Sequence, residues 1–308
     1  MGLSQQLSEP YHYRHAIDDP LSQQKSLVCQ VFGEYSVRGT KIHLASVRRM
    51  FSTGVRKLSG EDDLAKAWRH FIHDDDIVAL KFTSVGSHEL GTNRAAAAAL
   101  LQSLYQAGFK PSNFMLVGLD ELPDEAKGTR PCRYGWQKEN IDFGSDRDHL
   151  TRWLGEVTAI INIPSLMDDN IIGLRGTLAN LAWPLLKRPA RLYKNRGDPF
   201  VPEIYELPQV RGKIRLHIAN GLRILYYGGP EFKAQYVDDF GSLIISTDPV
   251  ALDRIALELI RRLRREKPLP YGVSEKINAP YLETAQAMGL GYQDLNFIDY
   301  QKIRHDMK

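Results

Sequence analysis

The stretch between residues 159 and 256 contains a succession of apolar runs, each followed by a polar or glycine-rich turn. A short apolar run bounded by turn residues is typical of a buried strand. Open α/β sheets bind their ligands at such strand ends. The pattern therefore indicates where a site lies, without naming a reaction. The turns are Pro164-Ser165, Asn220-Gly221, Gly228-Gly229-Pro230 and Thr247-Asp248-Pro249.

An earlier part of the chain alternates between strand and helix patterns. Residues 77–82 form an apolar run, residues 94–107 form a helical pattern that ends at Gly108, and residues 114–117 form another apolar run. This order implies a right-handed crossover between parallel strands. We therefore predict an α/β fold: a mostly parallel sheet with helices on both faces, in a three-layer architecture. Residues 148–154 are predicted to form a short helix.

The length of the chain, 308 residues, suits one large domain or two ordinary ones. Residues 1–27 are predicted to form a loose N-terminal arm. Residues 28–308 are predicted to form a single α/β domain, with a possible split into two lobes near residue 150. Residues 120–146 are polar and predict a long excursion from the sheet. Apart from one helical pattern, the tail at residues 268–308 is predicted to be irregular.

Composition disfavours several classes of protein. The formal charge of +3 gives no indication of a nucleic-acid or membrane partner. Cys29 and Cys132, the only cysteines, are far apart, so no disulfide framework and no self-contained iron–sulfur cluster is expected. No apolar stretch reaches the length of a membrane span, and residues 1–20 lack the apolar core of a signal peptide. We therefore predict a soluble, cytoplasmic protein, and leave its oligomeric state unassigned.

Lys81 is the most informative charged residue, because it lies near the end of an otherwise apolar strand and is followed by Thr83 and Ser84. A buried lysine there could bind an anionic ligand or have a lowered pKa. The alternative is a side chain that extends along the sheet edge into solvent.

Asp168 and Asp169 directly follow a predicted strand and precede Asn170. Their oxygen atoms are weak candidates for binding a hard cation such as magnesium. We favour the alternative, a turn in which the side chains cap backbone groups.

A basic loop at residues 187–196 precedes Asp198. Its five cationic side chains could contact phosphates or an acidic partner, although a solvated loop is the commoner explanation. No Gly-x-Gly-x-x-Gly opens a helix after the first strand, and no Gly-Lys-Ser/Thr loop occurs. The usual sequence signals for binding dinucleotides and nucleoside triphosphates are therefore missing.

Taken together, these segments resemble the family known as domain of unknown function 362, over roughly residues 40–290. The resemblance implies an α/β fold with its site at the strand ends. It also implies an association with redox proteins, because members are often joined to ferredoxin-like iron–sulfur modules. The residues that carry it are Ile163–Leu166, Gly176, Asn180-Leu181, Asp198-Pro199, Pro202-Glu203, Gly229-Pro230 and the most specific block, Thr247–Asp253.

The chain departs from the family pattern at several ionisable or polar positions, while the apolar scaffold is kept. Any acid–base or ligand chemistry that those groups provide in the family is therefore expected to be altered or lost here. The family pattern has, in order, asparagine, lysine, histidine, lysine, histidine and aspartate. This chain has Thr83, Met167, Asp169, Ala179, Tyr193 and Asn220.

Two hypotheses for the function follow. The first is a diverged, redox-associated enzyme that binds a small anionic substrate or cofactor, of a kind that the sequence leaves unknown, where the strands end. The second is a non-catalytic protein that uses the same scaffold, with the basic loop and the excursion, to bind a protein partner. The enzyme hypothesis expects four side chains to lie together at one rim of the sheet: Lys81, Asn180, Asn220 and Asp248. The predicted binding residues are Lys81, Asn180, Asp198, Asn220, Gly229 and Asp248, with the two aspartates braced against loops.

Overall fold

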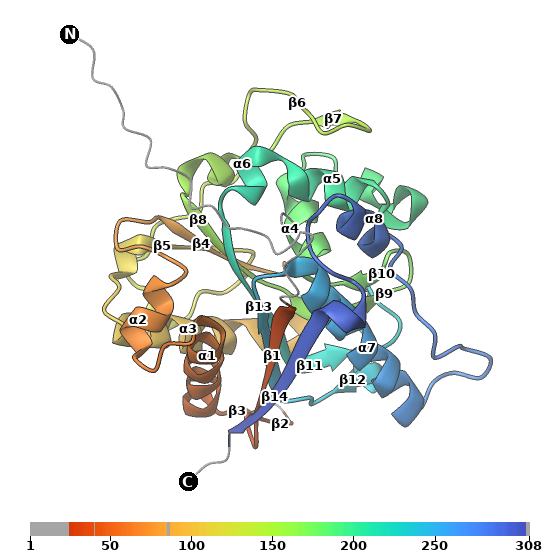
Figure 1. The fold of residues 1–308 in the computed structure, drawn as a ribbon, viewed down its shortest axis with the longest axis horizontal. Helices are drawn as coiled ribbons and strands as arrows, with labels where there is room; N and C mark the ends of the chain where they lie inside the picture. Colours follow the sequence, from red (N-terminus) through yellow and green to blue (C-terminus); the bar gives the residue numbers. More distant parts are fainter. Residues whose placement is uncertain (1–24, 40, 85–86, 306–308) are drawn as a thin grey trace.

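The computed structural model describes residues 25–39, 41–84 and 87–305, and in that part of the chain ten strands form one large sheet (Figure 1). Seven of them lie side by side, β9 and β12 pair with β11, and β10 pairs with β9. The order across the sheet is β14 (Ile298–His305), β1 (Ser26–Gly33), β13 (Ser242–Ser246), β11 (Ile214–Leu225), β8 (Ala159–Ile163), β4 (Val78–Phe82) and β5 (Phe114–Val117). The attached strands are β9 (Ser165–Asp169), β10 (Gly173–Arg175) and β12 (Val237–Asp238).

The strands β11, β8, β4 and β5 are parallel to one another, and β1 is parallel to β14. The strand β13 lies between these groups and is antiparallel to both of its neighbours. The carboxyl end of β13 therefore lies at the opposite edge of the sheet from the carboxyl ends of β4 and β8.

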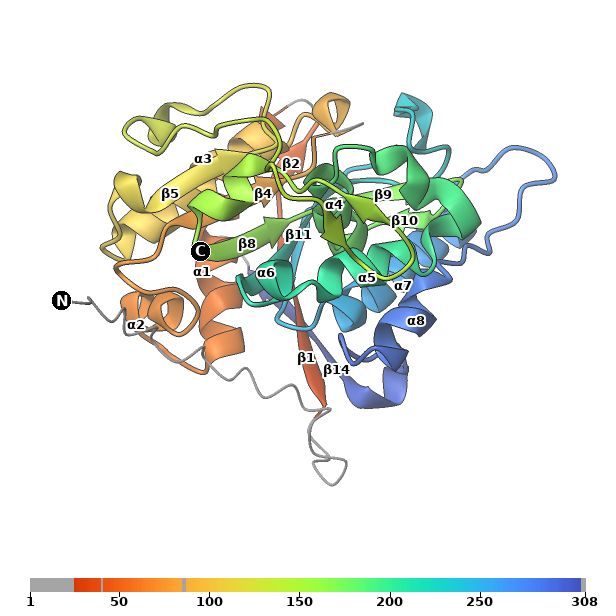
Figure 2. The same cartoon turned by 90° about the horizontal axis from the view of Figure 1, so that it is seen from above.

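Helices cover both faces of the sheet, which Figure 2 shows from above. One face packs against α1 (Leu44–Ser59), α2 (Leu64–Arg69) and α3 (Asn93–Gln106). The other face packs against α4 (Thr177–Leu185), α5 (Phe200–Glu206), α6 (Pro208–Arg211), α7 (Pro249–Glu266) and α8 (Tyr281–Ala287). The predicted three-layer α/β fold with a mostly parallel sheet is confirmed.

Alternate residues of the central strands face two separate apolar cores. On β4, Ala79 packs beneath the α4 layer while Leu80 packs beneath the α1 layer, and Ile160 and Ile161 divide in the same way on β8. Both faces of these strands are buried, which explains why their sequences are nearly continuous apolar runs. The sheet combines strands from both sides of residue 150.

Two local predictions were wrong. Residues 148–154 do not form an α-helix: β7 (Arg147–Asp148) pairs with β6 (Ile141–Asp142), and a 3₁₀ helix at Arg152–Glu156 follows. The tail is not irregular throughout, because β14 pairs along its whole length with β1. β14 pairs with β1, and Leu150 pairs with Leu186; local periodicity does not encode pairing between residues so far apart. The short strands β2 (Val37–Arg38) and β3 (Lys41–Ile42) form a separate hairpin.

The predicted N-terminal arm falls mostly on residues 1–24, which lie outside the described residues. Its last two residues, Ser26 and Leu27, belong to β1.

Candidate functional site

Three polar side chains lie in register across the middle of the sheet. Lys81 of β4 is paired with Asn162 of β8, and Asn162 is paired with His217 of β11. All three are on the face that α4 covers, and none is more than 1% exposed. Burying polar groups costs free energy unless they are hydrogen-bonded. This row therefore needs partners from the loops and helix above it.

Lys81 is buried without a carboxylate beside it. Its Nζ donates to the backbone oxygen of Phe82 at 2.6 Å and to Oδ1 of Asn180 at 3.0 Å. Within the described residues it forms no ion pair. Burial, together with the positive charge of Arg175, lowers the pKa of Lys81 to about 7. The neutral form of Lys81 is therefore accessible near neutral pH.

Asn180, in the first turns of α4, links Lys81 to the rest of the row. Its Oδ1 also accepts from the Thr83 hydroxyl at 2.8 Å, and its Nδ2 donates to Oδ1 of Asn162 at 2.7 Å. Asn162 in turn donates to the backbone oxygen of Thr177 at 2.8 Å. One amide side chain thus orients the lysine, a threonine hydroxyl and a strand residue together.

His217 is held in its neutral form at the far end of the row. Burial lowers its pKa to about 3. Its Nε2 is 2.9 Å from the Tyr205 hydroxyl, and its Nδ1 is 3.4 Å from Nδ2 of Asn162. Because the amide of Asn162 can only donate there, Nδ1 accepts and Nε2 carries the proton. A histidine that stays neutral across the physiological range has a structural rather than a titrating role.

A second set of hydrogen bonds connects the Lys81 region to Asn220. The Thr83 hydroxyl accepts from the backbone N–H of Ser165 at 2.9 Å. The Ser165 hydroxyl donates to Oδ1 of Asn93, and the same oxygen accepts from Nδ2 of Asn220 at 3.0 Å. The structure therefore brings three of the predicted residues, Lys81, Asn180 and Asn220, into one buried network.

Asp253 of α7 fixes the start of α4. Its carboxylate accepts from the backbone N–H groups of Thr177 and Leu178. Gly176 has to be a glycine here, because a Cβ would lie 2.2 Å from Oδ1 of Asp253. Burial raises the pKa of Asp253 to about 6. The most specific block of the family resemblance, which ends at Asp253, thus holds the helix that carries Asn180.

A small pocket of about 30 Å³ opens over Lys81. Arg175 supplies a second cationic side chain to its wall, where Nε of Arg175 donates to Asp169 at 2.9 Å and the guanidinium lies 5.6 Å from the centre of the Trp183 ring. Such a volume admits only a few atoms of a ligand. The lining residues are Lys81, Thr83, Ser84, Ile172, Arg175, Ala179, Asn180, Trp183 and Pro184.

Asp248 does not join this network, and the expected convergence of four residues is wrong in this respect. It caps α7, accepting from the backbone N–H of Ala251 at 2.8 Å, the Ser26 hydroxyl at 2.6 Å and the backbone N–H of Tyr292 at 3.0 Å. Asp248 follows β13, and β13 is antiparallel to β11. Asp248 therefore lies at the opposite edge of the sheet from the carboxyl ends of the parallel strands.

Gly229 and Asp198 also lie away from the Lys81 pocket. The N–H of Gly229 donates to Oδ2 of Asp168 at 3.3 Å, so this amide already has an anionic partner within the chain. Asp198 precedes α5, and its Oδ1 is buried with no hydrogen-bond partner among the described residues.

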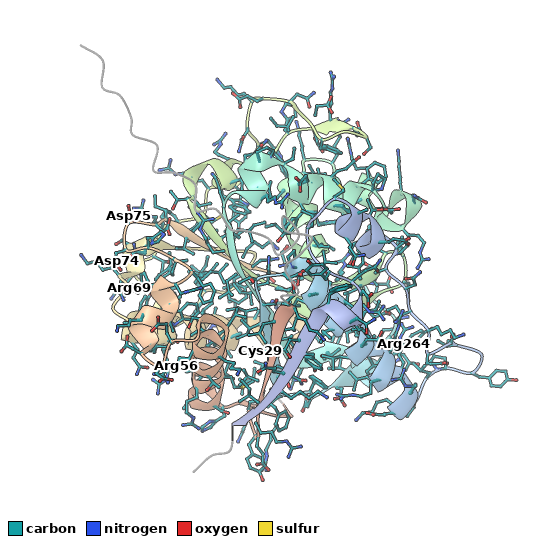
Figure 3. The ribbon with its side chains drawn as sticks, viewed as in Figure 1. Cys29, Arg56, Arg69, Asp74, Asp75 and Arg264 are labelled. Carbon is teal, nitrogen blue, oxygen red and sulfur yellow. The ribbon has the colours of Figure 1, made fainter. Side chains whose placement is uncertain are left out.

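Asp168 and Asp169 are each paired with an arginine. Asp168 accepts from Arg264 at 2.6 Å, and Figure 3 labels this arginine on α7. Asp169 accepts from Arg175 and caps the N–H groups of Ile171 and Ile172. No group of three metal-ligating side chains occurs in the described part of the chain. The carboxylates are thus used in the turn and in ion pairs, the alternative that the sequence favoured.

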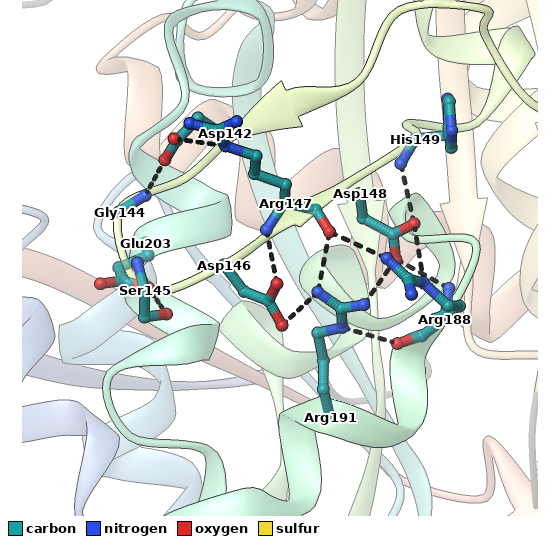
Figure 4. Close-up of polar contacts among 10 residues, drawn as sticks. All are labelled: Asp142, Gly144, Ser145, Asp146, Arg147, Asp148, His149, Arg188, Arg191 and Glu203. Carbon is teal, nitrogen blue, oxygen red and sulfur yellow. Dashed lines mark hydrogen bonds and ion pairs between the residues drawn. The ribbon is translucent and has the colours of Figure 1, made fainter.

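The basic loop at residues 187–196 forms polar contacts with the end of the polar excursion and with β7 (Figure 4). Arg191 forms an ion pair with Asp146, and Arg188 donates from its backbone N–H to Asp148 at 2.8 Å. Asp148 is 1% exposed. Arg191, whose side chain is 9% exposed, is therefore neutralised by carboxylates of the neighbouring hairpin, whereas the side chain of Arg188 is 66% exposed, with its Nε 3.7 Å from Oδ1 of Asp148.

The two cysteines do not form a ligand set. Cys29 is on β1 (Figure 3), Cys132 is in the excursion, and burial raises the pKa of each to about 11. An iron–sulfur cluster needs several deprotonated ligands around one point. The residues of this chain do not fit such a cluster.

Comparison with known proteins finds a family model that matches part of the chain. The model of the family described as "Domain of unknown function (DUF362)" matches residues 116–258. Over these residues the chain is similar to the DUF362 family. The matched region contains β8, β9 and α4, and with them Asn162 and Asn180, whereas Lys81 lies before it. No curated protein matches the chain. None of the described helices combines the length and apolar character needed to cross a bilayer.

Sequence reasoning missed Arg175 and Trp183, which complete the pocket. The available signal was weak: Arg175 stands alone before Gly176, and its ion pair with Asp169 forms across the β9–β10 hairpin. The hairpin itself was not predicted.

Proposed function

We propose that this protein is a diverged enzyme that binds a small anionic organic substrate or cofactor in the Lys81 pocket. One observation carries the proposal. Among the described residues, a fully buried lysine has only neutral acceptors around its Nζ, and the second cation on the pocket wall, Arg175, is close enough to lower its pKa.

The energetics of burial support this proposal. Removing an ammonium group from water without a counter-ion costs several kcal/mol. The lowering of the pKa expresses a free-energy cost of about the same size. A chain that needed only packing at residue 81 would be more stable with an apolar side chain there. An anionic ligand would supply the missing negative charge.

Five of the six departures from the family pattern lie around this pocket or in the network connected to it. Thr83 and Ala179 line it, Asp169 and Tyr193 contact Arg175, and Asn220 belongs to the connected network. We infer that the ligand or the chemistry of this member differs from that of its relatives. The redox association and the cytoplasmic location implied by the sequence stay part of the proposal.

The second candidate, a non-catalytic binding protein, is favoured by the same loss of ionisable groups. Such a protein would bind its partner with the basic loop at residues 187–196. In this loop, Arg188 and Arg191 already contact carboxylates at the end of the excursion and on β7, which argues against that use. An absorption spectrum and a metal analysis of the purified protein would separate the two. A stoichiometric chromophore or metal supports the enzyme, and a colourless, metal-free protein that co-purifies with another polypeptide supports the binder.

We expect anion binding to weaken as the pH rises. The ammonium form of Lys81 attracts an anion and the neutral form does not, so affinity should fall by up to about tenfold per unit above the pKa, which is about 7 in the free protein. Calorimetric titration with lactate at acidic and alkaline pH measures this. The variant Lys213→Met is the control, because Lys213 is a part-buried lysine outside the pocket with a lowered pKa. An affinity that is independent of pH would contradict the proposal.

A further inference from the structure

The hydrogen bonds of Lys81 leave one position of its nitrogen unused. An amine nitrogen has four tetrahedral positions: one is bonded to Cε, and two N–H groups donate to Phe82 and Asn180. In the neutral amine, the fourth position is the lone pair. Since both acceptors are part of the buried framework, they hold the nitrogen in one orientation. No described residue uses the lone pair, and Lys81 lines the pocket.

The pocket adds a site for a carboxylate next to this nitrogen. Arg175 lines the same wall, where it donates to Asp169 and Tyr193, and the five N–H donors of a guanidinium allow it to contact a second carboxylate as well. Ile172 and Trp183 make the remaining surface partly apolar. Because the pocket admits only a few atoms, the carboxylate and the reacting carbon must be close together in the ligand.

We propose that Lys81 forms an imine with the carbonyl carbon of a small 2-oxo acid whose carboxylate lies at Arg175. The Nζ lone pair forms the new C–N bond while the carbonyl electrons move to oxygen. Nitrogen then loses protons, the oxygen leaves as water, and the product is a C=N bond without net oxidation or reduction. Buried lysines with lowered pKa values act as nucleophiles in this way. This inference rests on the proposed anion-binding function of the same pocket.

Reductive trapping with pyruvate tests the proposal. Sodium cyanoborohydride delivers hydride to the imine carbon and converts C=N into a stable C–N bond. We expect the intact protein to gain the mass of one reduced pyruvyl group, and peptide mapping to locate it on Lys81. At saturating pyruvate, trapping should be faster at mildly alkaline than at mildly acidic pH, because only the neutral amine attacks. This pH dependence is opposite to that of lactate binding.

Two variants and one analogue make the outcomes distinct. Lys81→Met should abolish the specific adduct, whereas Lys213→Met should form it as the native protein does. Lactate has the carboxylate but no carbonyl, so it should bind without being trapped and should slow the trapping of pyruvate. Binding of both acids with no adduct on Lys81, or with an adduct spread over surface lysines, would overturn this inference alone. Binding of neither acid would overturn the anion-binding function as well.

Discussion

Replacing Lys81 with methionine is expected to abolish the binding of small anions and, at the same time, to stabilise the fold. Methionine has a similar length and no charge, so the free energy spent on burying the amine is recovered. The opposing loss is two hydrogen bonds, to Phe82 and Asn180. Asn180 keeps its hydrogen bond from Thr83. Replacing buried charges with apolar side chains is often neutral or stabilising by about 1–4 kcal/mol, and we expect a gain of that order.

Chemical denaturation at several pH values checks this prediction. The folded pKa of Lys81, about 7, is below the unfolded value of 10.5, so the unfolded chain binds more protons between these limits. The penalty for the native lysine is therefore full below pH 7 and disappears as the pH rises toward 10.5. The advantage of Lys81→Met should shrink over that interval. A variant that is less stable than the native protein at neutral pH would show that the lysine contributes to folding.

Replacing Arg264 with methionine is expected to destabilise the protein by roughly 3–5 kcal/mol, because it leaves the buried Asp168 carboxylate without its counter-ion. Asp168 joins three segments: it is on β9, it accepts from the N–H of Gly228 at 2.8 Å, and it pairs with Arg264 of α7. Arg265→Met is the matched control, since the neighbouring Arg265 is exposed. Its effect should stay within about 0.5 kcal/mol.

The pH dependence gives the Arg264 experiment a second readout. Burial raises the pKa of Asp168 to about 6 even with Arg264 present. Without the arginine, the pKa should rise further, and the folded state would take up a proton more readily than the unfolded chain. The stability deficit should therefore be smaller at mildly acidic than at alkaline pH. Adding Asp168→Asn to the variant should recover part of the loss. An equal deficit at both pH values would contradict the role of the carboxylate.

Arg264 also illustrates the limits of reading charge from sequence. In the sequence, Arg264 and its neighbours Arg261, Arg262 and Arg265 form a basic cluster at helical spacing, a pattern typical of an exposed helix face. In the structure Arg264 is 7% exposed and donates to the backbone oxygen of Tyr226 as well as to Asp168. The helical period of α7 was predictable, but which charged side chain faces inward depends on a carboxylate almost a hundred residues earlier.

The sequence by itself determined the strands and helices of the centre of the fold and the edge at which Lys81, Asn180 and Asn220 meet. Apolar periodicity and turn residues are local properties, and parallel strands necessarily bring their carboxyl ends together. Only the tertiary structure decided that β13 runs the other way and carries Asp248 to the opposite edge. It also decided that β14 pairs with β1 and that Arg175 completes the pocket. Strand direction and buried ion pairs depend on contacts between residues far apart in the chain, and no local pattern specifies them.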